Sequence, residues 1–165
     1  MIARDQYLDK ILSFKDQPLI KIITGIRRCG KSTVLSLLKK YLLSNGVSAK
    51  QIIAINFESF AFSEFTDAQK LYLFISKQIK PQNKYYLLID EVQEVTNWEK
   101  CINSLLVDFD IDIYITGSNS HLLSSELATH LAGRYVEIPI YTLSFNEYLS
   151  FNAHYKTNIS EDTRK

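Results

Sequence analysis

Hydrophobic residues gather in five short runs along the chain, separated by longer segments with helical spacing of apolar positions. The runs are rich in β-branched and aromatic residues, as strands are, and lie at residues 19–25, 51–57, 85–90, 111–116 and 135–141. The spacing between them predicts helices at 31–44, about 66–79, 97–108 and 120–131, with a last short helix at 145–151. Strands that alternate with such helices predict an α/β fold, with a parallel sheet covered by helices on both faces.

Local composition refines this order of elements. The run 85–90 is apolar at every position up to its final acid, so we expect a central strand buried on both sides. The segment 57–66 is aromatic but irregular, which predicts a loop and a short turn. A chain of 165 residues is expected to form one domain, here over residues 1–151, followed by a polar tail at 152–165 that frays.

The first strand runs directly into a complete G-x-x-x-x-G-K-S sequence, from Gly25 to Ser32, and the helix follows at once. Its glycines let the backbone turn tightly, so that successive N–H groups face a phosphate at the positive end of the helix. Lys31 adds a charge for the β- and γ-phosphates, and the Ser32 hydroxyl is placed to bind magnesium. This strand–loop–helix setting predicts binding of a nucleoside triphosphate with Mg²⁺.

Two adjacent carboxylates, Asp90 and Glu91, end the central strand. In a parallel sheet the carboxyl ends of the strands line the ligand crevice, so Asp90 is expected to hold magnesium opposite Ser32. Glu91 is expected to orient or deprotonate the water that attacks the γ-phosphate. Kinases of small molecules do not require this glutamate, and no N-K-x-D sequence for reading guanine is present. The pair therefore favours hydrolysis of ATP.

Two later segments are each open to two interpretations. Ser118 and Asn119 follow the fourth strand, where either can contact the attacking water or the γ-phosphate, or simply cap the next helix. Arg134 lies between that helix and the fifth strand, where it is either a surface charge or a finger that reaches a neighbouring subunit's nucleotide. Gln93 likewise suits either contact with the attacking water or packing.

Charge and composition bear on the binding partners and on the cellular compartment. DNA is kept among the candidate partners, although the net charge of +1 does not support binding of nucleic acid. No apolar stretch reaches the ~20 residues of a membrane-spanning helix. The two cysteines and three scattered histidines form no disulfide framework or metal-ligand spacing, which fits a cytoplasmic protein. Cys29 has no accompanying base, so we do not expect it to act as a nucleophile.

Six strings of residues together carry a family resemblance, which covers about residues 16–151: Ile23 to Thr33, Leu88 to Gln93, Trp98-Glu99, Ile115 to Ser120, Leu131 to Tyr135 and Leu143 to Leu149. They resemble AAA-type ATPases of the additional-strand, catalytic-glutamate division of P-loop NTPases. Within that division the strings are most similar to prokaryotic AAA ATP-binding proteins that usually carry a C-terminal nuclease-like domain of unknown function.

The resemblance implies a three-layer P-loop NTPase fold with a five-stranded parallel sheet in the order 5-1-4-3-2. We expect strands one and three to lie side by side and so to bring Lys31 and Asp90 together. It implies ATP and Mg²⁺ as cofactors, with magnesium at Ser32 and Asp90 and catalytic candidates Glu91, Lys31, Ser118 or Asn119 (sensor 1) and Arg134. The implied cofactor-binding loop consists of Gly25, Ile26, Arg27, Arg28, Cys29, Gly30, Lys31, Ser32 and Thr33.

Family members continue into a helical lid and further domains, and the lid is expected to be absent from this chain. We therefore expect a slow ATPase, mostly monomeric, with self-association or an additional C-terminal domain as candidate partners. The alternative is a nucleotide-gated switch or binding module with little turnover.

Overall fold

The computed structural model describes residues 4–117, 131, 133–145 and 147–153. A five-stranded parallel sheet runs through the molecule in the order β2-β3-β4-β1-β5, which confirms the expected order. Its strands are β1 (Ile20–Thr24), β2 (Ile52–Asn56), β3 (Tyr85–Asp90), β4 (Ile111–Gly117) and β5 (Tyr135–Pro139). Each lies within, or within one residue of, a hydrophobic run of the sequence, so strand positions followed from burial alone.

In the described part of the chain, four labelled α-helices and three short 3₁₀ turns precede the strands or connect them. The helices are α1 (Asp5–Leu12), α2 (Lys31–Ser44), α3 (Ala68–Ser76) and α4 (Trp98–Asp108). The turns are η1 (Ala49–Gln51), η2 (Phe60–Phe65) and η3 (Val92–Glu94), and residues 147–153 are helical, as expected for the end of the domain. The helix α1 was not predicted, and the helix expected at 120–131 lies almost wholly outside the described residues.

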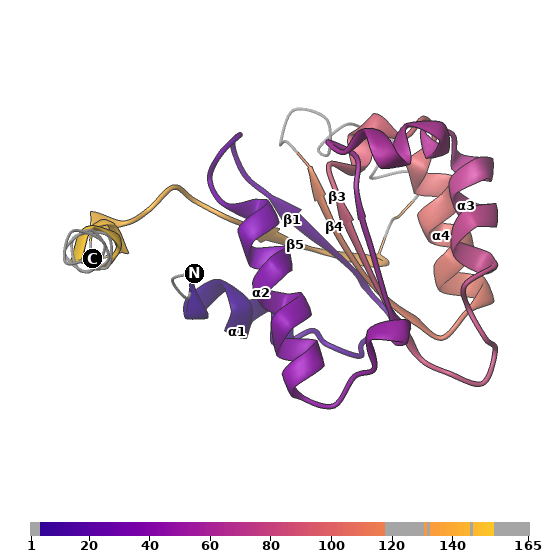
Figure 1. The fold of residues 1–165 in the computed structure, drawn as a ribbon, viewed down its shortest axis with the longest axis horizontal. Coiled ribbons are helices and arrows are strands. Elements are labelled where there is room, and N and C mark those ends of the chain that lie inside the picture. The colour runs from indigo at the N-terminus through magenta and orange to yellow at the C-terminus, as the bar shows by residue number, and fades with distance from the viewer. Residues whose placement is uncertain (1–3, 118–130, 132, 146, 154–165) are drawn as a thin grey trace, which may run out of the picture.

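The helices cover both faces of the sheet, because side chains alternate from face to face along each strand (Figure 1). Leu87 and Ile89 pack with α3 and α4 on one face, while Tyr86 and Leu88 pack with α1 and α2 on the other. Trp98 is buried in the first of these cores, as expected for a lone tryptophan. The three layers of the predicted fold are therefore present.

The expectation that strands one and three are neighbours was wrong. β4 lies between them, since Ile115 pairs with Ile22 of β1 on one edge and with Ile89 of β3 on the other. Each edge of a strand accepts one neighbour, so β4, which pairs on both edges, separates β1 from β3. The loop after β1 and the acids after β3 consequently face each other across the end of β4.

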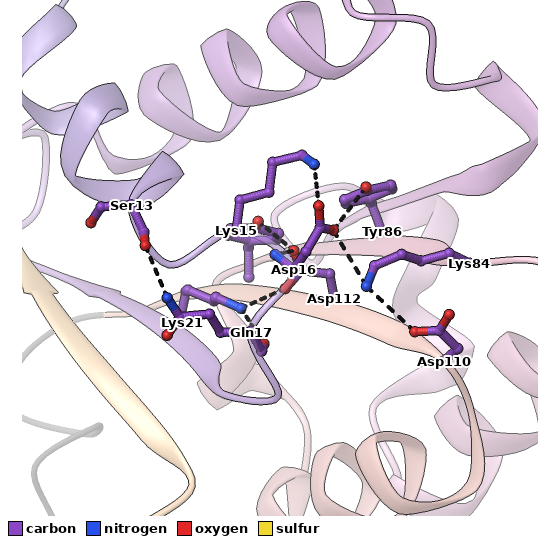
Figure 2. A network of polar contacts seen from close by, with 10 residues as sticks. Ser13, Lys15, Asp16, Gln17, Lys21, Lys84, Tyr86, Asp110 and Asp112 are labelled. Carbon is purple, nitrogen blue, oxygen red and sulfur yellow. Dashed lines mark hydrogen bonds and ion pairs between the residues drawn. The ribbon is translucent and has the colours of Figure 1, made fainter.

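A buried ion pair joins β1 and β4 near their amino ends (Figure 2). Lys21 Nζ lies 2.6 Å from Asp112 Oδ1, and both side chains are fully buried. Asp112 Oδ2 also accepts hydrogen bonds from the Tyr114 hydroxyl and the Asp16 backbone N–H, at 2.7 and 2.8 Å. Burial lowers the pKa of Lys21 in spite of its bond to Asp112, and burial with the charge of Asp112 raises the pKa of Tyr114. The pair thus links two neighbouring strands of the sheet inside the core.

Candidate functional site

The loop from Gly25 to Gly30 connects β1 to α2 at the carboxyl edge of the sheet. Gly25 has φ 152°, and a Cβ there would lie 2.3 Å from the backbone oxygen of Ile140. Gly30 has φ 103° and directly precedes α2. The backbone N–H groups in the first turn of a helix have no partner within the helix. Both glycines of the motif are therefore required by the backbone itself.

Lys31 is the first residue of α2, and its side chain reaches back to the start of this loop. Its side chain is 4% exposed, and Nζ donates to the backbone oxygens of Gly25 and Ile26 at 3.1 and 3.3 Å. The same nitrogen lies 3.9 Å from Glu91 Oε1. The ammonium group is thus held at the positive end of α2, where a phosphate is favoured by both the charge and the helix dipole.

Two openings flank Lys31, and Arg27 of the loop and Glu91 line both. One of about 380 Å³ is lined by Arg27, Lys31, Phe57, Glu58, Glu91, Gln93 and Glu94. The other, of about 410 Å³, runs over the loop and is lined by Arg27, Arg28, Gly30, Lys31, Ser32, Thr33, Glu58 and Glu91. The side chains of Arg27 and Arg28 are exposed, while Cys29 is buried beneath the loop. Each opening is in the size range of small-molecule sites.

Thr116 of β4 connects the two acids. Its hydroxyl donates to Asp90 Oδ1 and accepts from the Glu91 backbone N–H at 3.0 Å. Thr116 is fully buried and Asp90 is 5% exposed, so this arrangement is rigid on both sides. The sequence analysis did not single out Thr116; a hydroxyl at the end of the strand next to the acids was the available signal.

Asp90 and Ser32 line the same smaller cavity of about 250 Å³, between α2 and β2. A hydroxyl and a carboxylate suit Mg²⁺, which takes few protein oxygens and keeps waters and substrate phosphates as its other ligands. No cluster of three or more His, Cys, Asp or Glu side chains that could hold a metal occurs among the described residues. The residues present therefore fit a cation held partly by its substrate.

Glu91 has a left-handed backbone, with φ 57° and ψ 54°, at the point where β3 passes into η3. This conformation turns the chain so that adjacent residues, Asp90 and Glu91, line different openings. Oε2 of Glu91 accepts a hydrogen bond from Gln93 Nε2, while Oε1 faces Lys31. Left-handed backbone at a non-glycine residue is strained and persists where the surroundings determine it.

Arg4 supports the outer side of the loop, and sequence analysis missed it. Its guanidinium is buried and donates to the backbone oxygens of Cys29 and Tyr141 at 2.7 and 3.0 Å. Nε also pairs with Glu147 Oε1 at 2.9 Å, and the group stacks over the Tyr7 ring, 4.4 Å from its centroid. No local pattern marks this arginine, because its partners lie far along the chain.

Of the three remaining candidates, only Arg134 lies within the described residues. Ser118 and Asn119 lie outside the described residues. Arg134 lies at the other end of the strands, near the amino end of β1. Its backbone oxygen accepts a hydrogen bond of 2.8 Å from the N–H of Ile20, the first residue of β1. Its Nη1 donates to Asn103 Oδ1 of α4 at 2.8 Å on the surface. Arg134 therefore does not reach the phosphate loop of its own chain.

None of the helices in the described part of the chain is both long and apolar enough to span a bilayer.

Comparison with known proteins places this site in a family context. A family model described as an AAA domain matches residues 17–149. An uncharacterized protein from Haemophilus influenzae is 49% identical over 150 residues, which cover 90% of this chain and 38% of that protein. An uncharacterized protein from Methanocaldococcus jannaschii is 38% identical over 137 residues, or 80% of this chain and 28% of that protein. The chain thus spans well under half the length of these relatives.

Solved structures share the fold at low sequence identity. A DNA polymerase III γ subunit-related protein from Thermotoga maritima aligns with a TM-score of 0.61 at 14% identity, over 86% of this chain and 47% of that one. A DNA replication initiation factor aligns with a TM-score of 0.59 at 16% identity, over 94% of this chain and 50% of that one. At such identities the likeness concerns the fold alone.

Proposed function

Because the chain belongs to the AAA domain family, we propose that it binds ATP with Mg²⁺ at the loop from Gly25 to Thr33 and hydrolyses the γ-phosphate. The observation that carries this proposal is the meeting of Lys31 and Glu91, 3.9 Å apart, beside an opening of about 380 Å³. A cation for the phosphates and a carboxylate for water, on facing strand ends, are the two groups that hydrolysis requires.

In this mechanism the loop N–H groups and Lys31 hold the β- and γ-phosphates, and Lys31 offsets charge that develops during transfer. The Ser32 hydroxyl and the Asp90 carboxylate would hold Mg²⁺, which would neutralise phosphate charge when bound. Glu91 accepts a proton from the attacking water. Ser118 or Asn119 contacts that water or the γ-phosphate, as the family resemblance implies.

We further propose that Arg134 serves a neighbouring subunit. It lies at the end of the sheet opposite its own loop and is exposed there, which supports contact with the nucleotide of another copy rather than with its own. Self-association, or a further domain of a longer protein, is then the proposed setting for full activity.

A second candidate function is a nucleotide-gated switch with little turnover. The observation in its favour is Arg4, which ties the phosphate loop to Tyr141 and Glu147 beyond β5. A change in the loop on binding ATP would be transmitted to that segment whether or not hydrolysis follows.

Titration with labelled ATP and an assay of phosphate release test both candidates on the same samples. Lys31→Ala should weaken ATP binding about tenfold to a hundredfold, because a charged hydrogen bond contributes roughly 1.5–3 kcal/mol. Glu91→Gln should keep ATP affinity and lose roughly 10²–10⁴-fold in hydrolysis. Lys40→Ala, on the exposed side of α2, is the matched control. ATP binding without phosphate release, with and without double-stranded DNA, would favour the switch, and equal affinity in Lys31→Ala would reject the site.

A further inference from the structure

The side-chain amide of Gln93 bonds to the catalytic candidate Glu91 through its nitrogen, while its oxygen has no partner among the described residues. Its Nε2 donates to Glu91 Oε2, and its Oε1 is buried without a hydrogen-bond partner among those residues. Because a carboxylate can only accept, the amide nitrogen must be the atom that faces Glu91. A side chain that served only for packing would be better apolar here, since a buried amide oxygen without a partner is unfavourable.

The turn that carries Gln93 is itself fixed. Val92 and Val95 are buried at 0% and 2% exposure in the core under α3 and α4. The backbone N–H groups of Glu94 and Val95 donate to the oxygens of Glu91 and Val92 at 3.2 and 3.0 Å, which closes η3. Gln93 therefore reaches Glu91 from an anchored element, two residues further along the chain.

The carboxylate of Glu91 is consequently oriented from two sides. Gln93 occupies Oε2, so Oε1 is the oxygen directed toward Lys31 and the opening beside it. Thr116 fixes the backbone N–H of the same residue. A carboxylate held through one oxygen presents the other in a single direction, which is the arrangement that a general base needs.

We propose that Gln93 is a positioning residue for Glu91, which fixes Oε2 so that Oε1 takes the proton of the attacking water. The inference rests on the proposed ATP hydrolysis. The water oxygen bonds to the γ-phosphorus, one water proton passes to Glu91 Oε1, and the other remains on the new phosphate. The bond from the γ-phosphorus to the bridging oxygen breaks, and ADP leaves with that oxygen.

Steady-state kinetics of the 165-residue chain test this role with two variants of nearly native size. Gln93→Met removes the donor and keeps an unbranched chain, and Gln93→Glu replaces the donor with a second carboxylate. Gln93→Met should lower kcat roughly 10–100-fold and change KM and ATP affinity less than about threefold, since only orientation is lost. Gln93→Glu should lower kcat at least as far, because its carboxylate also repels Glu91. Gln82→Met, on the exposed turn before β3, should behave as wild type.

A double-variant comparison separates positioning from structural damage. In a Glu91→Gln background, Gln93→Met should lower the residual rate no further, because Gln93 acts through the group already removed. The inference would be overturned, with the proposed function left intact, by an unchanged kcat in both Gln93 variants. It would also be overturned if Gln93→Met lost as much ATP affinity as kcat, or lowered the rate equally in the wild-type and Glu91→Gln backgrounds. Absence of hydrolysis in the wild-type chain would overturn the proposed function together with it.

Discussion

Arg4 and Cys29 are joined by a hydrogen bond of 2.7 Å, from Nη1 of the guanidinium to the backbone oxygen inside the phosphate loop. The same guanidinium reaches Tyr141 and Glu147, so one side chain connects the start of the chain, the loop and the segment after β5. A planar group with five donors can do this where a lysine cannot. The shape of the loop thus depends on residues more than a hundred positions away.

Arg4→Met is expected to weaken ATP binding about tenfold, because the loop loses a charged hydrogen bond worth roughly 1.5–3 kcal/mol and is free to leave its binding shape. Arg4→Lys should restore only part of that loss. Isothermal titration with ATP measures the effect, and Lys10→Met on the exposed face of α1 is the control. An ATP affinity in Arg4→Met equal to that of Lys10→Met would show that the loop holds its shape unaided.

Glu147 should make the folded state sensitive to acid. Burial alone would raise its pKa, but hydrogen bonds from Arg4 and from the Ser144 backbone outweigh burial and place the pKa below the ordinary 4.5. A carboxyl with a depressed pKa stabilises the fold above its unfolded pKa and loses that contribution as the pH falls through the folded value.

Urea unfolding from pH 7 down to pH 3 measures this contribution. The free energy of unfolding of the wild type should exceed that of Glu147→Gln near pH 7, and the difference should shrink as the pH falls below about 4.5. Glu64→Gln, an exposed substitution, should give the same small difference at every pH. A gap between wild type and Glu147→Gln that stays constant with pH would contradict this account.

Lys21→Met should cost about 3–5 kcal/mol of stability, because it leaves Asp112 charged and fully buried without its cation. Adding Asp112→Asn should recover part of the loss, since the amide oxygen still accepts from Tyr114 and the charge is gone. Chemical unfolding compares the two variants, with exposed Lys50→Met as the control. A loss below about 1 kcal/mol in Lys21→Met would mean that the strands keep their register without the pair.

Arg134 should restore activity across an interface between copies. Lys31→Ala subunits keep Arg134, and Arg134→Ala subunits keep an intact loop, so mixing two poor enzymes should raise phosphate release if the finger acts in trans. An arginine supplied in this way accelerates transfer by roughly 10³–10⁵-fold. Asn103→Ala, which frees the side chain of Arg134 on its own surface, should leave complementation intact. Release that stays low on mixing and does not change with protein concentration would assign Arg134 to the surface.

The parts of this fold that depend on local pattern could be predicted from the sequence. Buried strands appear in the sequence as short hydrophobic runs, so the strands and the helix over Lys31–Ser44 could be predicted. The glycine-rich motif likewise indicated where the candidate site lies. Neighbours in the sheet were harder: the order was right, yet the adjacency inferred for strands one and three was wrong because β4 separates them.

Residues whose role comes from distant contacts could not be found in this way. Thr116 joins the acids only once β3 and β4 pair, and Lys21 is tolerable in a buried strand only beside Asp112. Helix α1 did leave a signal, since Tyr7 and Ile11 are spaced as one face of a helix, and both are buried. Arg4 left none.

The position of β1 in the sheet also bears on how the protein is made. β1 pairs with β4 on one edge and with β5 on the other, where Ile20 lies opposite Tyr135. The ribosome releases the phosphate-loop sequence before both flanking strands, and before the Ile140 backbone that contacts Gly25. Such distant pairings form slowly, because much chain must be ordered first. A nascent chain that carries the whole motif but lacks β4 and β5 is therefore expected to have no assembled loop, and the proposed binding of nucleotide would begin only after these strands are made.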